Sequence, residues 1–498
     1  MTPNRVPVRE RKVIAMATTA DEAIGEGQEL AAGTAGPLDV FAQGLAAAAP
    51  SIALAGVPAS LFLVTGKGAV WAAVIGAVVA LLIAVLISAQ ARRTVSSGSL
   101  GTYAGNGLGP GVGFTAGWGL IIGYVGFFCA GVVGAVLYFS LFLGKLGLDV
   151  QHTGWKLLIL VLVVAIATLV PLRGVSVSAR VGLTFEVLSL AGIGIIIVAA
   201  YVTQGAHLDT DQLSPVHLTH SSTYIAAVTA VGSYAGFESS AALGQEARDA
   251  HRSVARGVLR LVLMLAVLYL VSIYPQVTAF GGLDPDRAPL AQVAAHSGVA
   301  WTEWVIGLSV GLAALVWSSA VINAGARGLY TLAREGALPA VLGRVHPTRR
   351  TPSAAILVIG AIGLVTGVAA TVASVGRVQF ETYVATLSNW GFIVAYLLVA
   401  VGTPVWLYRI RALGAPILVT AVVSVAAVGY VIYHNLIPVP EFPYNILPYI
   451  FLGLLAVGAV RYLYLRRRHP EIARRISTVQ TLSPEERARQ QQLGLLSE

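Results

Sequence analysis

Long apolar stretches separated by short polar connections recur along the chain from residue 38 to residue 465. A helix needs about 20 apolar residues to cross roughly 30 Å of hydrocarbon. Hydrophobic residues make up 56% of the chain and charged residues 11%, whereas about 25% of the residues of a soluble protein are charged. The pattern predicts an all-α polytopic membrane protein with 12 transmembrane helices, over residues 39–65, 69–90, 113–143, 155–171, 180–203, 222–244, 256–279, 302–333, 352–374, 381–406, 414–434 and 444–465.

The distribution of Lys and Arg predicts the orientation, because cytoplasmic loops hold the excess of basic residues. With both termini placed in the cytoplasm, inner connections and inner span ends hold all but five of the 32 basic residues. The exceptions are Lys67, Lys145, Lys156, Arg287 and Arg377. We therefore expect a multi-pass protein of the cytoplasmic membrane. Its net charge of +9 fits loops that face an anionic inner leaflet better than nucleic-acid binding.

Two predicted spans carry residues that interrupt a helix. The first contains Ala49-Pro50-Ser51, and the sixth contains Gly236 two residues before Glu238. Because lipid cannot satisfy the freed backbone groups, such breaks occur where they line a cavity. Breaks in equivalent spans of two halves predict the substrate site of a secondary transporter. The predicted substrate-binding residues are Ala49, Pro50, Ser51, Ile52, Ala53, Ser233, Tyr234, Ala235, Gly236 and Phe237.

The chemistry of a broken helix suggests how a substrate would be held. The N-terminus of a half-helix exposes unpaired N–H groups and a partial positive charge, which suit a carboxylate. Carbonyl groups at the opposite half-end suit an ammonium group. We therefore expect the backbone of the two breaks to hold a zwitterionic amino acid, with selectivity left to the cavity walls.

Two carboxylates lie inside predicted spans, where a charge marks function by default. Glu238 would act as a gate on the unwound backbone, as the acceptor of a coupling proton, or as a brace to backbone N–H groups. Glu186 in the fifth span would carry a coupling proton or pair with Arg180. Candidates for the cavity wall are Trp118, Tyr124, Phe127, Phe128, Trp317 and Asn389. The rings among them could cover an ammonium by cation–π contact or serve only in packing.

Three runs of sequence resemble the superfamily of amino acid, polyamine and organocation transporters. Residues Tyr234 to Glu238 are similar to its aromatic-x-Gly-Phe-Glu break, and residues 323–339 are similar to the end of its eighth span. Residues 97–103 resemble its inner loop before the third span. The resemblance covers about residues 38 to 465. It implies a LeuT-like fold, a 5+5 inverted repeat plus two additional helices in which helices 1 and 6 are broken.

The resemblance divides the chain into six parts. They are a flexible cytoplasmic tail (1–37) without the apolar core of a signal peptide, the first repeat (38–204), an extracellular loop (205–221), the second repeat (222–406), helices 11 and 12 (407–465) and a cytoplasmic C-terminal tail (466–498). We expect the C-terminal tail to lie on the membrane as a short helix or to be disordered. In the fifth span, Ser189 stands where some relatives have a lysine, so Ser189 joins Glu186 and Glu238 among the gating or coupling candidates.

We therefore expect a secondary active transporter of amino acids or related amines that works by alternating access. Proton-coupled uptake is the first expectation, and a sodium ion stays open as the coupling ion. The alternatives are an amino acid/polyamine exchanger and a non-transporting nutrient sensor on the same fold. An enzyme is not expected, because no cluster of ligands or nucleophile with its base converges. The single cysteine, Cys129, excludes an intramolecular disulfide, and no cofactor or metal is expected. The expected partners are the substrate and the lipid bilayer, with the oligomeric state open.

Overall fold

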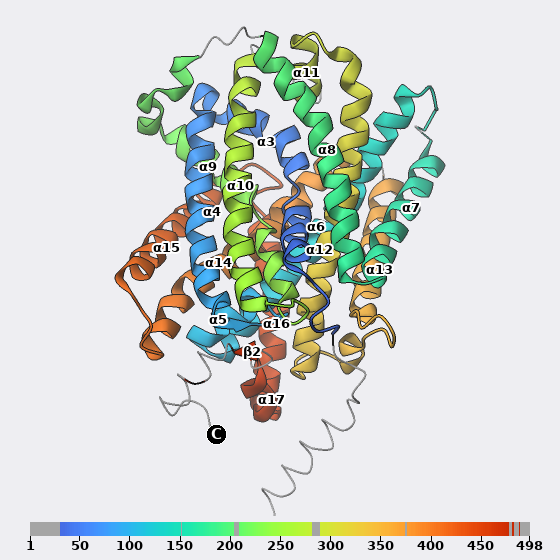
Figure 1. Cartoon of the computed structure of the whole chain (residues 1–498). Coiled ribbons are helices and arrows are strands. Elements are labelled where there is room, and N and C mark those ends of the chain that lie inside the picture. The colour runs from blue at the N-terminus through green and yellow to red at the C-terminus, as the bar shows by residue number, and fades with distance from the viewer. Residues whose placement is uncertain are drawn as a thin grey trace, which may run out of the picture.

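A computed structural model of the chain describes residues 30–150, 152–203, 209–280, 289–373, 376–477, 481–482 and 488. Within these residues, ten helical segments are long and apolar enough to cross a membrane. Most of them run roughly along one common direction and form a single bundle (Figure 1). The chain is therefore an all-α, multi-pass membrane protein.

Helices follow every predicted span. They are α2 (Pro37–Ala48), α3 (Pro50–Thr65), α4 (Ala69–Ala91), α6 (Pro110–Lys145), α7 (Thr153–Leu172), α8 (Val175–Thr203), α9 (Ser221–Gly232), η4 (Phe237–Leu243), α10 (Ala250–Ala279), α12 (Glu303–Arg334), α13 (Ser353–Val372), α14 (Arg377–Arg409), α15 (Ala415–Leu436) and α16 (Leu447–Arg468). Several begin earlier than predicted, since polar residues at a span end continue the helix beyond the apolar run.

Two places account for ten segments where twelve spans were predicted. Residues Pro37–Ala91 count as one segment of 55 residues, which covers the first two predicted spans. The sixth predicted span is divided into α9 and η4, and each part is too short to cross a membrane alone. The difference between ten segments and twelve predicted spans therefore arises at the two predicted breaks and at the tight turn of residues 66–68 between α3 and α4.

Short elements fill the connections between the long helices. They are η1 (Gly66–Gly68), β1 (Thr94–Val95), α5 (Leu100–Leu108), η2 (Thr210–Leu213), η3 (Pro215–Thr219), α11 (Pro289–His296), η5 (Ala300–Thr302), η6 (Ala340–Gly343), α17 (Pro470–Arg475) and β2 (Thr481–Leu482). The sequence predicted a loop where α5 lies. All of its first six residues are buried, so tertiary packing holds this glycine-rich stretch helical.

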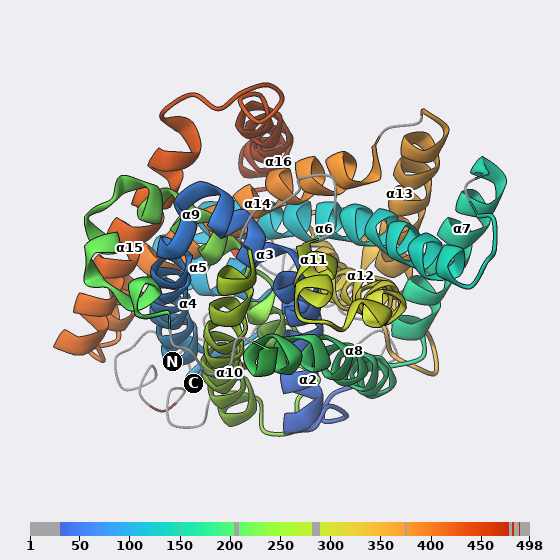
Figure 2. The same cartoon turned by 90° about the horizontal axis from the view of Figure 1, so that it is seen from above.

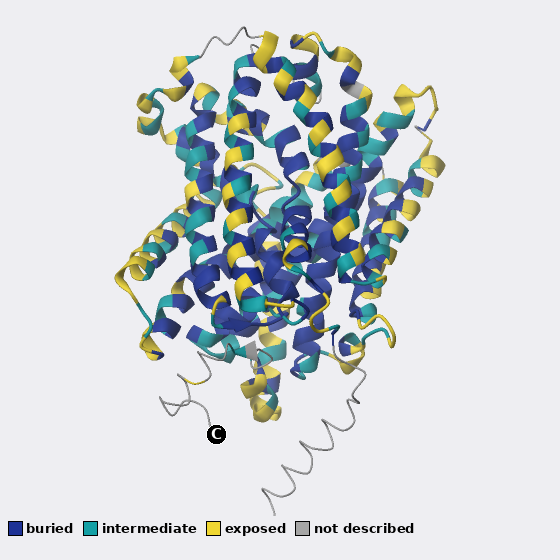
Figure 3. Cartoon of the chain, viewed as in Figure 1, coloured by how far each residue is buried: buried dark blue, intermediate teal, exposed yellow. Residues whose placement is uncertain are grey.

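The bundle has a buried centre and an apolar rim. Figure 2 shows α3 near the middle, with α7 and α13 at one side and α15 at the other. Buried residues concentrate in the interior of the bundle (Figure 3). The rim helices instead expose large apolar side chains, such as Leu162 of α7, Val365 of α13 and Val422 of α15. Such surfaces suit contact with lipid tails.

Parts of both predicted tails pack against the bundle. Ala35 is fully buried and forms a parallel bridge with Ala247, so the flexible tail predicted over residues 1–37 does not include its last residues. Residues 1–29 lie outside the described part of the chain. At the other end, Ala473 and Ile476 are buried, and β2 pairs antiparallel with β1. The described part of the C-terminal tail therefore packs on the protein, which neither predicted alternative foresaw.

Candidate functional site

The first helix break is a single residue. Ala49, between α2 and α3, adopts the left-handed conformation with φ 45° and ψ 60°. Pro50 is the first residue of α3, where its missing N–H costs nothing and its fixed φ suits a helix start. The predicted interruption is therefore present, and its cause is the proline together with the residue before it.

The second break is a turn of four residues. Helix α9 ends at Gly232, and the chain resumes as the 3-10 helix η4 at Phe237. Gly236 has φ 109°, a conformation that only glycine adopts at low cost. All seven residues of η4 are buried, so the break lies inside the protein.

The two breaks touch each other. A Cβ atom placed on Gly236 would lie 2.2 Å from the carbonyl oxygen of Ala47 and 3.0 Å from the amide nitrogen of Ala48. One turn earlier, a Cβ on Gly44 would lie 2.2 Å from Oγ of Ser240. Two glycines thus allow the backbones of α2 and η4 to cross in close contact.

A cavity of about 480 Å³ adjoins this crossing. It is lined by Ala48, Ala49, Ile52, Ala53, Gly56, Val57, Ser60, Phe127, Val228, Thr229, Gly232, Ser233, Ala235, Trp317, Thr382, Ala385, Thr386, Asn389, Trp390, Ile393, Asn435 and Tyr444. Ser60 is exposed and so is Tyr444, so the cavity reaches the surface of the protein. Its size falls in the range of small-molecule sites.

Five of the ten predicted substrate-binding residues line this cavity. They are Ala49, Ile52, Ala53, Ser233 and Ala235. Pro50, Ser51, Gly236 and Phe237 lie behind the wall, where they shape the breaks. Gly232 leaves the cavity open toward Asn389, whose Nδ2 would be 3.4 Å from a Cβ at that position.

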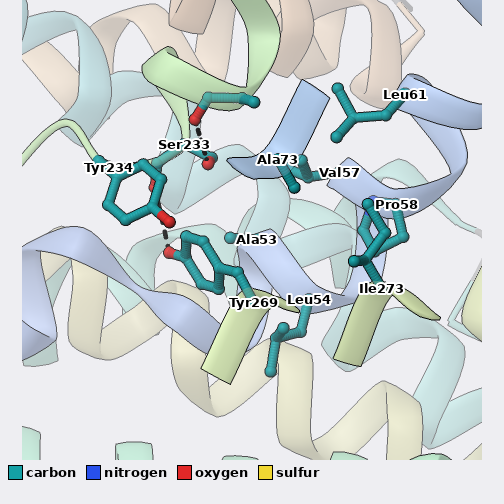
Figure 4. Close-up of a pocket in the computed structure, with 11 residues that line it drawn as sticks. Ala53, Leu54, Val57, Pro58, Leu61, Ala73, Ser233, Tyr234, Tyr269 and Ile273 are labelled. Carbon is teal, nitrogen blue, oxygen red and sulfur yellow. Dashed lines mark hydrogen bonds between the residues drawn. The ribbon is translucent and has the colours of Figure 1, made fainter. Parts of the chain in front are cut away.

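Tyr234 lines a second, smaller cavity between α3, α4, α9 and α10. Its ring lies beside that of Tyr269, with the centroids 5.0 Å apart (Figure 4). The Tyr269 hydroxyl donates to the carbonyl oxygen of Ser233 at 3.1 Å. This cavity holds about 20 Å³, which is room for about one water molecule. It is too small for an amino acid, so the larger cavity is the candidate substrate site.

Of the proposed wall residues, Trp317, Phe127 and Asn389 line the large cavity, and three others lie elsewhere. Trp118 donates from Nε1 to the carbonyl oxygen of Leu454 at 3.0 Å, so it packs against α16. Phe128 fills the space next to Gly363 of α13. Both rings have packing roles, Trp118 against α16 and Phe128 against α13.

Glu238 is fully buried and its carboxylate is surrounded by donors. The hydroxyl of Tyr124 donates to Oε1 at 2.6 Å, and the hydroxyl of Tyr396 donates to Oε2 at 2.6 Å. The amide of Gly236 also donates to Oε2, at 3.0 Å. Tyr124 is therefore a partner of Glu238 and does not line the cavity. The carboxylate ties the second break to α6 and α14.

Glu186 reaches the first break from α8. Its Oε1 accepts a hydrogen bond from the amide of Ser51 at 2.9 Å, and both residues are fully buried. Its Oε2 has no hydrogen-bond partner within the described protein. The alternative pairing with Arg180 is wrong, since Arg180 lies near Asp39, with Nε 3.8 Å from Oδ1. Glu186 therefore caps the start of α3.

Ser189 lies one turn farther along α8 and is also fully buried. Its hydroxyl makes hydrogen bonds to the carbonyl oxygens of Phe185 at 2.8 Å and Ser309 at 2.7 Å. It thus links α8 to α12 and does not face the cavity.

A buried polar network closes the bundle on the side of the two tails. Arg327 is fully buried and holds Glu246 with two hydrogen bonds, one from Nη2 to Oε1 at 2.9 Å. Arg327 also donates to Asn323, and Asn323 donates to Gln43 at 2.8 Å. The network joins α12 to the loop after η4 and to α2. The neutral side chains of Asn323 and Gln43 supply the additional hydrogen bonds that a buried ion pair requires.

Sequence reasoning missed part of the cavity wall. Thr382, Ala385, Thr386, Asn389 and Ile393 trace one face of α14, and Asn389 alone had been singled out. The helical spacing from Asn389 could have found the others. Asn435, in the last turn of α15, and Tyr444, in the connection between α15 and α16, carry no comparable signal. Among the described residues, no group of three or more His, Cys, Asp or Glu side chains could hold a metal ion.

Comparison with known proteins finds relatives over most of the chain. The profile of the amino acid permease family matches residues 38–458. An uncharacterized transporter of Mycobacterium tuberculosis is 29% identical over 328 residues, which cover 64% of this chain and 69% of that protein. The low-affinity putrescine importer PlaP of Escherichia coli is 27% identical, with coverage of 62% and 66%. The branched-chain amino acid permease BcaP of Bacillus subtilis is 24% identical, with coverage of 68% and 75%.

Proposed function

We propose that this chain, which belongs to the amino acid permease family, is a secondary active transporter of amino acids or related amines that works by alternating access. The observation that carries the proposal is the cavity of about 480 Å³ beside two helix breaks in contact. Broken helices at a central site are the hallmark of such transporters. Similarity to both a putrescine importer and an amino acid permease supports the substrate range.

The proposed topology has twelve spans in a LeuT-like arrangement, with repeats over residues 38–204 and 222–406 and both termini in the cytoplasm. It is supported by the positions of the breaks, which interrupt the first and sixth predicted spans. Residues 205–221 would then lie outside the cell, and residues 407–465 would form the two helices beyond the repeats.

In this topology the structure corresponds to an outward-facing state. The cavity reaches the surface at Ser60 and Tyr444, while the Arg327–Glu246 pair and the Ala35–Ala247 bridge lie on the side of the tails. Inward opening would require this tail-side network to separate. The pair therefore acts as the inner gate.

Proton coupling is the proposed energy source. It is supported by two fully buried carboxylates, Glu186 and Glu238, whose hydrogen-bond partners in the described part of the chain include no basic side chain. Glu186 has one oxygen without a partner, so it can accept a proton without losing its bond to Ser51. Glu238 has donors on both oxygens, which favours the brace role for that residue.

Uptake into proteoliposomes tests the proposed function. A panel of labelled amino acids and amines would be offered with an inward proton gradient, with a sodium gradient, or with unlabelled substrate inside. Accumulation driven by the proton gradient is expected. Flux that needs internal substrate would make the protein an exchanger, and ligand binding without flux would indicate a sensor.

The two carboxylates can be separated in the same assay. Glu186→Gln is expected to lose accumulation driven by the gradient but to keep exchange with internal substrate, because only the coupling proton is removed. Glu238→Gln is expected to lose both, since the second break loses its brace. Unchanged accumulation by Glu186→Gln would exclude this residue as the proton carrier.

A further inference from the structure

The backbone N–H groups at the start of α3 are already used within the chain. Pro50 has no N–H, and the amide of Ser51 donates to Glu186. The amides of Ile52 and Ala53 both donate to the carbonyl oxygen of Ala49, at 3.0 and 3.2 Å. The half-helix N-terminus, which would be the natural site for a carboxylate, therefore already holds the carboxylate of Glu186.

The amides of residues 234 to 237 at the second break are also used within the chain. The amides of Tyr234, Ala235 and Phe237 donate to the carbonyl oxygens of Val231, Gly232 and Tyr234. The Gly236 amide donates to Glu238. In addition, none of the described residues that line the large cavity is Lys, Arg or His. A substrate carboxylate would thus enter a site without a cation or a free half-helix N-terminus to receive it.

The same site is well supplied for a cation. The last turn of α2 presents its carbonyl end at Ala48 on the cavity wall, and Pro50 cannot donate to the carbonyl four residues before it. Oδ1 of Asn389 is buried without a hydrogen-bond partner in the described protein. The rings of Phe127 and Trp317 lie with centroids 4.9 Å apart on the opposite wall. Carbonyl dipoles, an amide oxygen and aromatic faces all favour an ammonium group.

We propose that Glu186 is a built-in anion that occupies the carboxylate position at the first break, so that the cavity selects aliphatic amines that lack a carboxylate over the corresponding amino acids. This inference rests on the proposed function and narrows its substrate class. Glu186 discriminates in two ways. It takes up the Ser51 N–H, and in its unprotonated form, before it accepts the coupling proton, its charge repels a second carboxylate through low-dielectric protein.

Matched pairs that differ by one carboxylate test the inference. Purified wild-type protein in detergent would be titrated with putrescine and ornithine, cadaverine and lysine, and isoamylamine and leucine, with binding measured by thermal stabilisation and by displacement of labelled amine. Within at least one pair, the amine is expected to bind at least tenfold more tightly than the amino acid. Equal or tighter binding of the amino acid in every pair would overturn the inference.

A variant assigns the selectivity to Glu186. Glu186→Gln keeps an oxygen that can accept from Ser51 but lacks the charge, and it is expected to reduce the amine-to-amino-acid ratio at least fivefold. Glu381→Gln is the matched control, because Glu381 is also a carboxylate in a spanning helix but lies against Gly134 of α6, away from both breaks. A ratio unchanged in Glu186→Gln, or lowered equally in Glu381→Gln, would contradict the role of Glu186.

Failure of this inference can be told from failure of the proposed function. If amino acids are accumulated in proteoliposomes and bind at least as tightly as the corresponding amines in every pair, the chain is a transporter and the selection against carboxylates is wrong. If neither member of any pair binds and no compound is transported, the proposed function itself fails. The wild-type titration needs no variant, so the inference stays testable even where Glu186→Gln does not fold.

Discussion

Gly236 lies against the carbonyl group of Ala47, so closely that a Cβ atom would be 2.2 Å from its oxygen. This contact joins the two helix breaks, although Ala47 and Gly236 are 189 positions apart in the sequence. It also fixes the floor of the large cavity, because Ala48 and Ala235, the neighbours of the contact, both line it. The geometry of the substrate site therefore depends on a position without a side chain.

Replacing Gly236 by alanine is expected to abolish uptake. The new Cβ would clash with backbone, and φ 109° would add a strain of about 1–3 kcal/mol. Uptake would be measured in proteoliposomes and normalised to the amount of monodisperse protein. Gly194→Ala of α8 is the control, since a Cβ there meets nothing within 4 Å. Wild-type uptake by Gly236→Ala would show that the two backbones are not in contact.

The two tyrosines that bind Glu238 are expected to contribute unequally. In Tyr124→Phe, Oε1 of Glu238 loses its donor, which costs about 1–3 kcal/mol for a buried acceptor. In Tyr396→Phe, Oε2 keeps the Gly236 amide, so the melting temperature should fall less. Tyr103→Phe is the control, because the Tyr103 hydroxyl is buried without a partner in the described structure and its loss should not destabilise. Equal melting temperatures for Tyr124→Phe and wild type would refute the brace.

Removing Arg327 is expected to destabilise the protein strongly. Breaking a buried ion pair from one side costs about 3–5 kcal/mol, because the remaining charge is left uncompensated. Arg327→Met should therefore lower the melting temperature, and the double variant Arg327→Met with Glu246→Leu should recover part of the loss. Arg327→Lys should also be destabilised, since lysine cannot form the two-pronged contact.

Arg256→Ala serves as the comparison for this series. Arg256 lies exposed on α10, and a surface substitution of this kind usually changes stability by less than about 0.5 kcal/mol. If Arg327→Met had the same melting temperature as Arg256→Ala, the network on the tail side would not contribute to the stability of the protein. If the double variant were no more stable than Arg327→Met, the uncompensated charge of Glu246 would not be the cause of the loss.

Cysteine labelling is expected to map the cavity. The only cysteine, Cys129, is buried, so a Cys129→Ala background carries few complications. Ala385→Cys lies on the cavity wall and should react with a membrane-impermeant methanethiosulfonate, more slowly when substrate is bound. Val399→Cys, at a fully buried position of the same helix, should not react. Equal reactivity of the two positions would mean that α14 does not present this face to an open cavity.

The helices and both breaks could be predicted because their causes are local. An apolar run of sufficient length, the proline at the first break and the glycine at the second each act within a few residues. The partner of Ser51 could not be predicted in this way, since Glu186 lies 135 residues along the chain. No local pattern distinguishes a carboxylate that caps a half-helix from one that pairs with the nearby Arg180.

The aromatic residues show the same limit. Trp118 and Trp317 both lie inside apolar spans, yet only Trp317 lines the cavity. The difference comes from Gly458 of α16, which lies so close to Trp118 that a Cβ would be 2.3 Å from its ring. Such a packing partner becomes visible only when the distant helix is in place. Residue type alone therefore identifies candidate residues for the cavity wall but does not predict which of them line it.

The two breaks differ in mechanical character. Between α2 and α3 the interruption is Ala49 alone, so a change in the angle between these helices must be taken up largely by one pair of backbone dihedrals. Between α9 and η4 there are four residues, and the deformation can be shared. The first break therefore acts as a single-residue hinge, whereas the second is a flexible segment of four residues. A residue at position 49 with more restricted φ and ψ would therefore limit the orientation of the whole of α3.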